Sequence, residues 1–142
     1  MSDHVTVHGL VATEPRHLTT KDGLEITSFR LAAMQRRFDK QLGKWRDDGT
    51  NWYSVASFRI LAKNAAASIE KGHRVIVSGR LKVREWDAGE KSGISVDIEA
   101  DSIGHDLLWG STTFERNRMP VDDVDETSQD DPDEPELDDD TF

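Results

Sequence analysis

Residues 74–86, RVIVSGRLKVREW, alternate between two kinds of side chain. Successive side chains of a β-strand point to opposite faces, so a period of two places each kind on its own face. One face carries Val75, Val77, Gly79, Leu81, Val83 and Glu85, and the other carries Arg74, Ile76, Ser78, Arg80, Lys82, Arg84 and Trp86. The segment is therefore predicted to be a strand with its first face in a core and its second face, a cationic strip ending in an indole, in solvent.

The same period of two occurs in four other segments, 4–12, 24–38, 52–60 and 94–103. Polar stretches containing glycine, 13–23 and 39–51, separate the first three and are predicted as a turn and a flexible hairpin loop. Residues 61–72, LAKNAAASIEKG, combine four alanines with helical apolar spacing, and Gly72 is placed to end a helix. Five strands with one helix between the third and the fourth predict a small antiparallel barrel.

The charge of the chain is divided very unevenly along its length. Residues 1–110 contain 16 Lys and Arg against 15 Asp and Glu, net +1, whereas residues 111–142 contain 2 against 13, net −11, which together give the overall −10. Acidic groups at that density repel one another, and the segment offers few apolar side chains to bury. Folding is therefore expected in the first part of the chain, with an acidic tail after it.

Several features bear on the compartment. The chain has no cysteine, so it forms neither disulfides nor thiolate metal sites. Its first ten residues, MSDHVTVHGL, do not combine a basic region with an apolar run, and there is no apolar stretch of membrane-spanning length. We expect a cytoplasmic protein.

Aromatic side chains stand beside basic ones at outward-facing positions of three predicted strands. Cations neutralise a phosphate backbone, and aromatic rings stack on bases of any identity with about 1–3 kcal/mol per base. Taken singly, an aromatic residue on a strand is more often core, and a basic strip is more often a solvated face. Their coincidence on three strands indicates a surface for single-stranded nucleic acid, whose unpaired bases are free to stack.

The order of four segments resembles the bacterial single-stranded DNA-binding proteins, tetrameric proteins with an OB fold. The segments are RRFDK (36–40), NWYSVASF (51–58), the helix ending in EKG (70–72) and VIVSGRLKVREW (75–86). The resemblance covers about residues 4–106, and GKWRDDG (43–49) is similar to the actinobacterial branch of the family. It implies an all-β chain with one helix, folded as a five-stranded OB-fold barrel.

The resemblance also implies site residues. The aromatic side chains that the family stacks against bases match Phe38, Trp52, Phe58 and Trp86. We expect phosphate contacts from Arg30, Arg36, Arg37, Lys40, Arg80, Lys82 and Arg84, and further loop contacts from Lys44, Trp45 and Arg46. Ser54 and Glu85 stand where well-known members carry basic residues, which predicts weaker phosphate contact or an altered footprint.

The family resemblance predicts what the chain does and with whom. It implies a homotetramer that binds single-stranded DNA with little sequence preference during replication, repair and recombination. Such a protein is expected to be associated with the nucleoid in the cytoplasm. In the family an acidic tail with an apolar tip docks genome-maintenance proteins, which here assigns partner docking to Asp138, Asp139, Asp140, Thr141 and Phe142. The usual tip has an apolar residue and a proline before its phenylalanine. Asp140 and Thr141 stand there in this chain, so weaker docking or fewer partners are expected.

The predicted organisation has three parts. Residues 1–106 are expected to form the OB-fold DNA-binding domain, and residues 119–142 a disordered acidic tail. Residues 107–118 include Leu107, Leu108, Trp109 and Phe114, and they resemble an additional strand with which actinobacterial members clamp a neighbouring subunit. An apolar cap over the chain's own barrel is the alternative for this segment.

Two other classes of function stay open. An OB-fold scaffold with weak DNA binding, or a sequence-tolerant RNA-binding protein, would use much of the same surface. No nucleophile motif or phosphate-cradling glycine loop occurs, so we expect no enzyme activity and no cofactor. His4 and His8 lie four residues apart, which on a strand separates them by roughly 13 Å, so no metal site is expected there.

Overall fold

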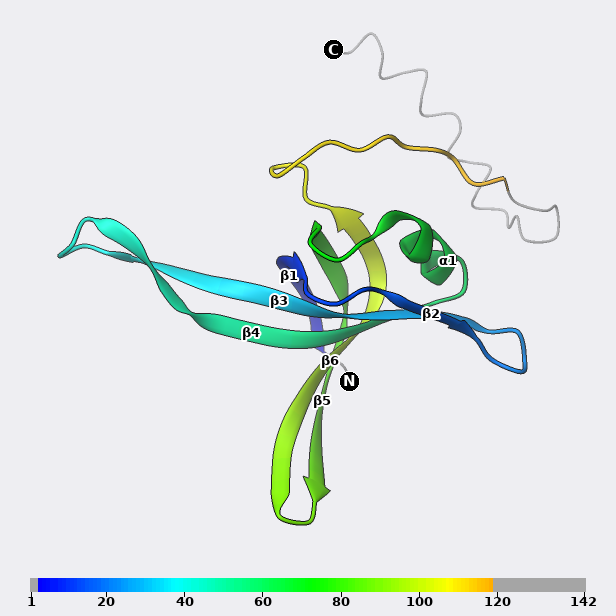
Figure 1. Ribbon diagram of the computed structural model, residues 1–142, viewed down its shortest axis with the longest axis horizontal. Helices are drawn as coiled ribbons and strands as arrows, with labels where there is room; N and C mark the ends of the chain where they lie inside the picture. Colours follow the sequence, from blue (N-terminus) through cyan, green and yellow to red (C-terminus); the bar gives the residue numbers. More distant parts are fainter. Residues whose placement is uncertain (1–2, 119–142) are drawn as a thin grey trace, which may run out of the picture. The chain divides into compact units, whose positions relative to one another are not determined.

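A computed structural model describes residues 3–118 of the chain (Figure 1). The chain divides into two compact units, Met1–Thr112 and Thr113–Phe142, and the described part of the second, residues 113–118, contains no helix or strand. The elements of the first unit are β1 (Asp3–Val11), β2 (Arg16–Thr19), β3 (Glu25–Asp39), β4 (Lys44–Phe58), α1 (Arg59–Ser68), β5 (Arg74–Ala88) and β6 (Lys91–His105). The fold is thus all-β with one helix between two strands, as predicted.

The strands form one closed sheet in the order β1-β5-β6-β4-β3-β2, in which an additional β1–β3 pairing closes the barrel. Most neighbours are antiparallel, but β4 and β6 pair in parallel where Ser54, Val55 and Ala56 face Asp97, Ile98 and Glu99. The predicted fully antiparallel barrel is therefore wrong at this one junction. Alternation within a strand is the same in both kinds of pairing, so periodicity could not reveal the parallel pair.

Three predicted boundaries differ from the structure. The stretch predicted as a turn contains the short edge strand β2, which pairs only with β3 and whose side chains are exposed, so it lacks a burial pattern. The predicted loop 39–51 is mostly strand, since only residues 40–43 separate β3 from β4. The helix ends at Ser68, before Gly72, because Ile69 turns to an extended backbone and packs into the core.

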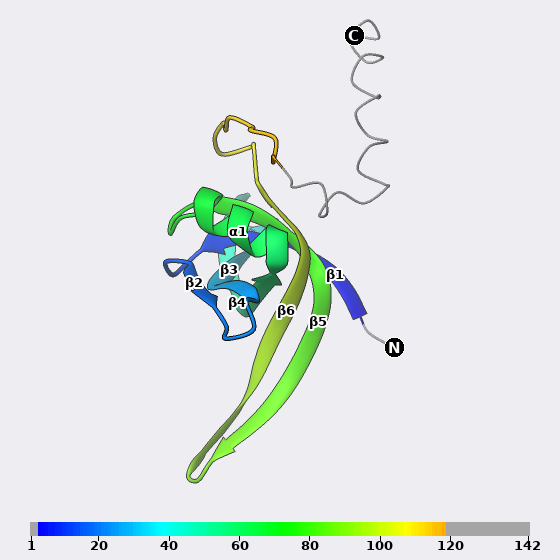
Figure 2. The same cartoon turned by 90° about the vertical axis from the view of Figure 1, so that its right-hand side faces the viewer.

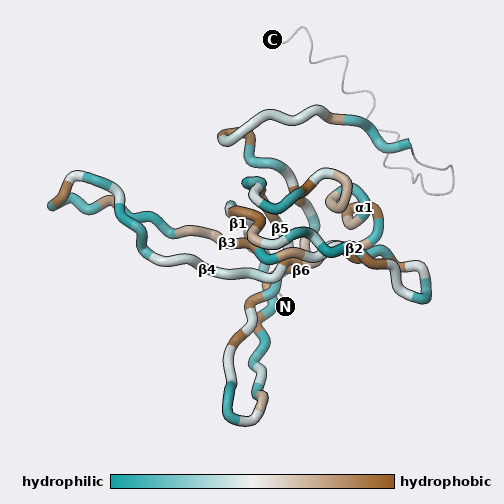
Figure 3. The backbone as a smooth tube through the Cα atoms, in the orientation of Figure 1, coloured by the Kyte–Doolittle hydropathy of each residue, from teal (hydrophilic) through white to brown (hydrophobic). Residues whose placement is uncertain are grey.

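The core lies inside the barrel and beneath α1. The fully buried residues there include Val11, Leu31, Val75, Val77 and Ile98. For Val75 and Val77 this confirms the core face predicted for residues 74–86. Burying such aliphatic side chains contributes about 1.5–3 kcal/mol each relative to exposure. Figure 3 shows hydrophobic segments gathered where the barrel strands and the helix meet.

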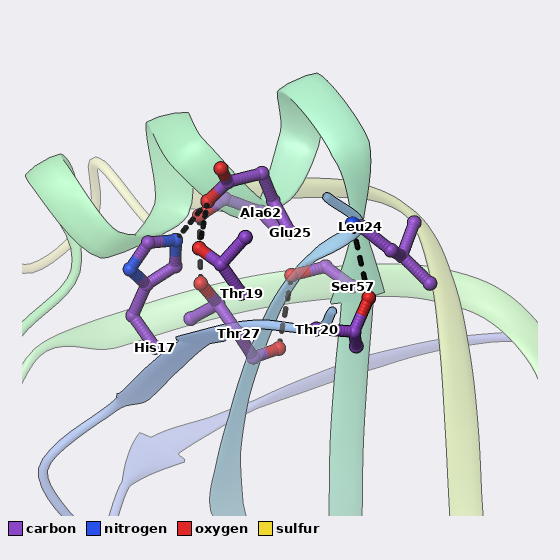
Figure 4. Close-up of polar contacts among 8 residues, drawn as sticks. All are labelled: His17, Thr19, Thr20, Leu24, Glu25, Thr27, Ser57 and Ala62. Carbon is purple, nitrogen blue, oxygen red and sulfur yellow. Dashed lines mark hydrogen bonds and ion pairs between the residues drawn. The ribbon is translucent and has the colours of Figure 1, made fainter. Parts of the chain in front are cut away.

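Two buried hydroxyl groups fasten the helix and the sheet together (Figure 4). Thr27 Oγ1 donates a hydrogen bond to the Ala62 carbonyl of α1 at 2.7 Å, and Ser57 Oγ donates to the Thr27 carbonyl at 3.1 Å. Buried polar groups are costly unless they are paired, so these bonds fix where α1 sits on β3 and β4.

Two long antiparallel hairpins extend from the barrel in different directions (Figures 1 and 2). We call the outer part of β3–β4 the first arm and the outer part of β5–β6 the second arm. The second arm leaves the barrel beyond a bulge at Ser78/Gly79. A Cβ on Gly79 would come within 2.2 Å of the Glu99 carbonyl oxygen, so only glycine permits this close approach of the two strands. Within residues 3–118, no helix has the length and apolar character needed to cross a membrane.

Candidate nucleic-acid interface

The second arm carries the predicted cationic strip. Cross-strand register places Arg80, Lys82, Arg84 and Trp86 of β5 opposite Glu99, Asp97, Ser95 and Gly93 of β6. All four β5 side chains are exposed, and the Trp86 indole lies against Gly93. The arm therefore presents three cations in a row that ends at a half-exposed aromatic ring.

The opposite face of the second arm departs from the prediction. Val75, Val77 and Gly79 are buried, but Val83 is 59% exposed and Glu85 is also in solvent. The alternation is unbroken, but the strand has left the barrel at this point and has no core to face. The predicted core face is therefore wrong beyond Leu81.

The first arm and its base carry the other aromatic candidates. Phe38 and Trp52 are each about half exposed, whereas Phe58, at the end of β4, is partly buried. The Arg30 guanidinium lies over the Trp52 ring at 5.4 Å from its centroid and donates a hydrogen bond to Ser54 Oγ at 2.9 Å. Arg30 and Trp52 thus form one cationic and aromatic platform, with Ser54 holding the guanidinium in place.

A bulge in β4 brings a fifth aromatic side chain to this face. Met34 pairs with Thr50 but Arg36 pairs with Asp47, so β4 has one extra residue between them. The extra residue shifts the alternation of β4 and turns Trp45 to the face of Phe38, where the two rings meet edge to face at 5.4 Å between centroids. The sequence prediction left Trp45 in a loop, since a bulge cannot be read from alternation alone.

Other predicted cations of the first arm lie on its opposite face. Arg37 pairs with Arg46 and Asp39 with Lys44, a set that alternates with Phe38 and Trp45. Arg46 forms an ion pair with Asp39 at 3.1 Å. Hydrogen bonds from the Leu42 backbone N–H and from Arg46 hold the pKa of Asp39 below its ordinary value. The face opposite the aromatic face that carries Arg36 therefore holds Arg37, Lys44 and Arg46. Lys40 lies in the turn between β3 and β4.

The outer faces of the two arms are continuous through the parallel pairing of β4 with β6. Arg30 pairs with Ser54, Ser54 with Asp97, and Asp97 with Lys82, which makes one row across four strands. The next row contains Ser28, Ala56, Glu99 and Arg80. We call this surface, from Trp52 and Arg30 to Arg84 and Trp86, the outer face.

Two carboxylates missed by sequence reasoning lie in the middle of the outer face. Arg80 Nη2 is 3.0 Å from Glu99 Oε1, and Lys82 Nζ is 3.6 Å from the same oxygen. Arg84 Nε donates to Asp97 Oδ2 at 2.6 Å, and Ser95 Oγ donates to Asp97 Oδ1 at 3.2 Å. The sequence predicts a strand over residues 94–103, but which cations these two acids face follows from the strand register.

Residues 109–112 line a cavity of about 290 Å³ at the other end of β5 and β6. Trp109 covers the Arg74 guanidinium at 4.5 Å, and His105 Nε2 is hydrogen-bonded to His73 Nδ1 at 3.0 Å. Leu107 and Leu108 are exposed, so the alternative of an apolar cap is wrong for them. Residues 107–118 form no strand within this chain, and the inter-subunit clamp stays a prediction.

Two further predictions concern a metal site and the partner-docking tip. Residues 3–118 contain no group of three or more His, Asp or Glu side chains arranged to hold a metal ion. His4 instead contacts Asp101 at 2.8 Å. The predicted partner-docking residues Asp138, Asp139, Asp140, Thr141 and Phe142 lie outside the described residues.

Comparisons with known proteins agree on one family. A model of the single-strand binding protein family matches residues 2–106. The chain is 52% identical over 114 residues to single-stranded DNA-binding protein 2 of Tropheryma whipplei (strain Twist), covering 80% of this chain and 75% of that protein. It is 40% identical over 112 residues to single-stranded DNA-binding protein 2 of Streptomyces avermitilis, covering 79% and 70%.

Solved structures show the same likeness in three dimensions. The small single-stranded DNA-binding protein from Streptomyces coelicolor matches with a TM-score of 0.70 and 39% identity, over 77% of this chain and 98% of that chain. The second single-stranded DNA-binding protein from Mycobacterium smegmatis matches with a TM-score of 0.64 and 28% identity, over 82% and 100%. The predicted OB fold is confirmed by these neighbours.

Proposed function

Because this chain belongs to the single-strand binding protein family, we propose that it binds single-stranded DNA along the outer face, with little preference for sequence. The observation that carries the proposal is the continuity of that face, which joins the Arg30–Trp52 platform to the cations and indole of the second arm. A single strand of DNA lying across the outer face can place its phosphates against the cations and its bases against the aromatic rings.

The roles of individual residues follow from their placement. Trp52 and Trp86 stack bases on separate arms, Phe38 stacks one farther along the first arm together with Trp45, and the partly buried Phe58 offers a ring edge at the barrel. Phosphates are contacted by Arg30, Arg36, Arg80, Lys82 and Arg84 on the outer face. Where the DNA strand wraps around the first arm, further phosphate contacts come from Arg37, Lys40, Lys44 and Arg46.

This function can be tested by titrating the full-length chain with a long oligothymidine at about 50 and 300 mM salt. The tryptophan fluorescence of the protein is the signal. Stacked indoles are expected to give strong quenching that persists at the higher salt, since stacking is less salt-dependent than phosphate contact. A parallel titration with oligouridine tests the RNA alternative. Absence of quenching at both salts would overturn the proposal and favour the scaffold alternative.

Assembly is proposed to be a homotetramer. Exposed apolar side chains on the reverse of the second arm, Val83 at 59% and Ile94 at 65% exposure, support association because a second copy would cover them. The clamp by residues 107–118 belongs to the same proposal. Sedimentation equilibrium of the full chain is expected to give four times the chain mass, and a monomer at micromolar concentration would contradict it.

The acidic tail is proposed to recruit replication, repair and recombination proteins. Its support is chemical: the carboxylates of Asp138, Asp139 and Asp140 suit a basic rim on a partner, and the Phe142 ring suits a small apolar pocket. A matched pair of peptides, residues 130–142 with the natural sequence or with the substitution F142A, is immobilised and offered to purified proteins of those three classes. Equal capture by both peptides would count against the docking role of Phe142.

A further inference from the structure

The centre of the outer face carries less positive charge than the predicted strip suggests. Arg80, Lys82 and Arg84 supply three positive charges, and Asp97 and Glu99 supply two negative charges within 3.6 Å of them. These five side chains together carry a net charge of only +1. A phosphate chain binds by replacing its condensed cations with protein cations, so cations that are already paired with carboxylates contribute less to affinity.

The two carboxylates lie deeper than the cations that they hold. The side chains of Asp97 and Glu99 are 23% and 34% exposed, whereas those of Arg80, Lys82 and Arg84 are 50%, 59% and 66% exposed. Asp97 is fixed further by the hydrogen bond from Ser95. A phosphate arriving from solvent therefore meets the cations first, while the carboxylates stay beneath them.

Contact with a phosphate does not require that these ion pairs break. Arg84 uses Nε for Asp97, which leaves its two terminal nitrogens for a second acceptor, and Arg80 uses Nη2 for Glu99. Guanidinium groups have five N–H donors, so one group can serve a carboxylate and a phosphate together. The carboxylate then remains close to the bound phosphate, and the two negative charges repel each other.

Any DNA strand that crosses the outer face passes close to these two carboxylates and meets this repulsion. Asp97 and Glu99 flank the β4–β6 pairing, beside Ser54 and Ala56, where the two arms meet. A DNA strand that runs from the Arg30–Trp52 platform to Trp86 crosses this junction. We propose that Asp97 and Glu99 act as built-in attenuators, which hold the cations of β5 in place and lower the affinity of the outer face for single-stranded DNA. This inference rests on the proposed function.

The test is a comparison of the full-length wild-type chain with D97N, E99Q and the double variant, each titrated with fluorescent oligothymidine at several salt concentrations. Repulsion between an exposed carboxylate and a nearby phosphate is similar in size to an exposed ion pair, so each single variant is expected to bind up to about fivefold more tightly at low salt. The double variant is expected to bind roughly tenfold more tightly, with a steeper salt dependence because more counterions are released.

Two control variants remove the same charge elsewhere. Asp101 lies on the same strand but contacts His4, so D101N is the first control. The second is E70Q, since Glu70 lies just beyond α1, is exposed and makes no ion pair with any described residue. Both are expected to change affinity less than twofold. Equal gains in affinity in the controls would mean that only the net charge of the protein matters, and would overturn the proposal. Unchanged or weaker DNA binding by E99Q would overturn it as well.

The outcomes for the inference and for the proposed function are separable. Failure of the wild-type chain to bind oligothymidine would reject the proposed function without any variant. Binding by the wild type with no gain in the variants would reject only the attenuation. Should D97N prove unstable in thermal unfolding, E99Q, which lacks the Ser95 contact, decides the question.

Discussion

Trp86 lies over Gly93, its cross-strand partner at the outer end of the second arm. A Cβ added to Gly93 would come within 2.6 Å of the Trp86 ring atom Cζ2, too close for any real contact. Glycine at this position therefore lets the indole lie against β6, while 46% of Trp86 stays exposed. Covering of a strand glycine by an aromatic neighbour is a known device of β-sheets.

The first prediction concerns this pair. G93A is expected to displace the Trp86 indole and to weaken binding of oligothymidine by about 1–3 kcal/mol, the value of one stacked base. G104A is the matched control, since the added Cβ on the same strand meets no atom within 4 Å. Near-ultraviolet circular dichroism of the free protein should change in G93A and not in G104A. Unaltered binding by G93A would show that the indole orientation is immaterial.

A second prediction addresses the two arms separately. W52A and W86A are each expected to cost about 1–3 kcal/mol of binding free energy. The two losses should add, because the residues lie on different arms and share no partner. W109A controls for loss of an exposed indole away from the outer face, beside Arg74. Binding that survives the W52A/W86A pair would show that the outer face is wrongly assigned.

A third prediction follows from the turn of the first arm. Asp39 accepts hydrogen bonds from the backbone N–H groups of Gln41 and Leu42, and the bond from Leu42 contributes most to its lowered pKa. A carboxyl group with a lowered folded-state pKa stabilises the turn at pH above its ordinary value of 3.8. That stabilisation is lost as pH falls through the lower folded value.

Amide NMR signals of Gln41 and Leu42 should therefore shift in an acid titration below pH 3.8 in the wild type. In D39N the same signals should show no such step, because the amide does not titrate. D47N is the comparison, since it removes a carboxylate that caps Gly49 on the same arm. An unchanged titration of the two amides in D39N would rule out Asp39 as the titrating group.

A fourth prediction tests the buried hydroxyl of Thr27. T27V keeps the shape of the side chain but removes the hydrogen bond to the Ala62 carbonyl, and is expected to lower the free energy of unfolding by about 1 kcal/mol. T50V, on the exposed part of β4, should change it by less than about 0.5 kcal/mol. Urea unfolding monitored by circular dichroism gives both values. If T50V lowers the free energy of unfolding as much as T27V does, the hydrogen bond from Thr27 does not account for the loss.

Much of this arrangement could be predicted from local pattern. Alternation within β5 correctly placed Val75 and Val77 inside and Arg80 and Trp86 outside. Such predictions succeed because the side-chain period of a strand is a local property of the backbone. The order of the motifs added the OB fold and the family, both of which the comparisons confirm.

The sequence by itself determined which side chains share a face where a predicted strand has no bulge. It also determined between which strands the helix lies and which family the chain belongs to. Only the tertiary structure decided which strands pair, in which direction and in which register. The β4 bulge turned Trp45 toward Phe38, and the parallel β4–β6 pairing set Asp97 beside Ser54 under the cations of β5. The physical reason is that register depends on contacts between residues far apart in the chain, and a shift of one residue moves a side chain to the opposite face.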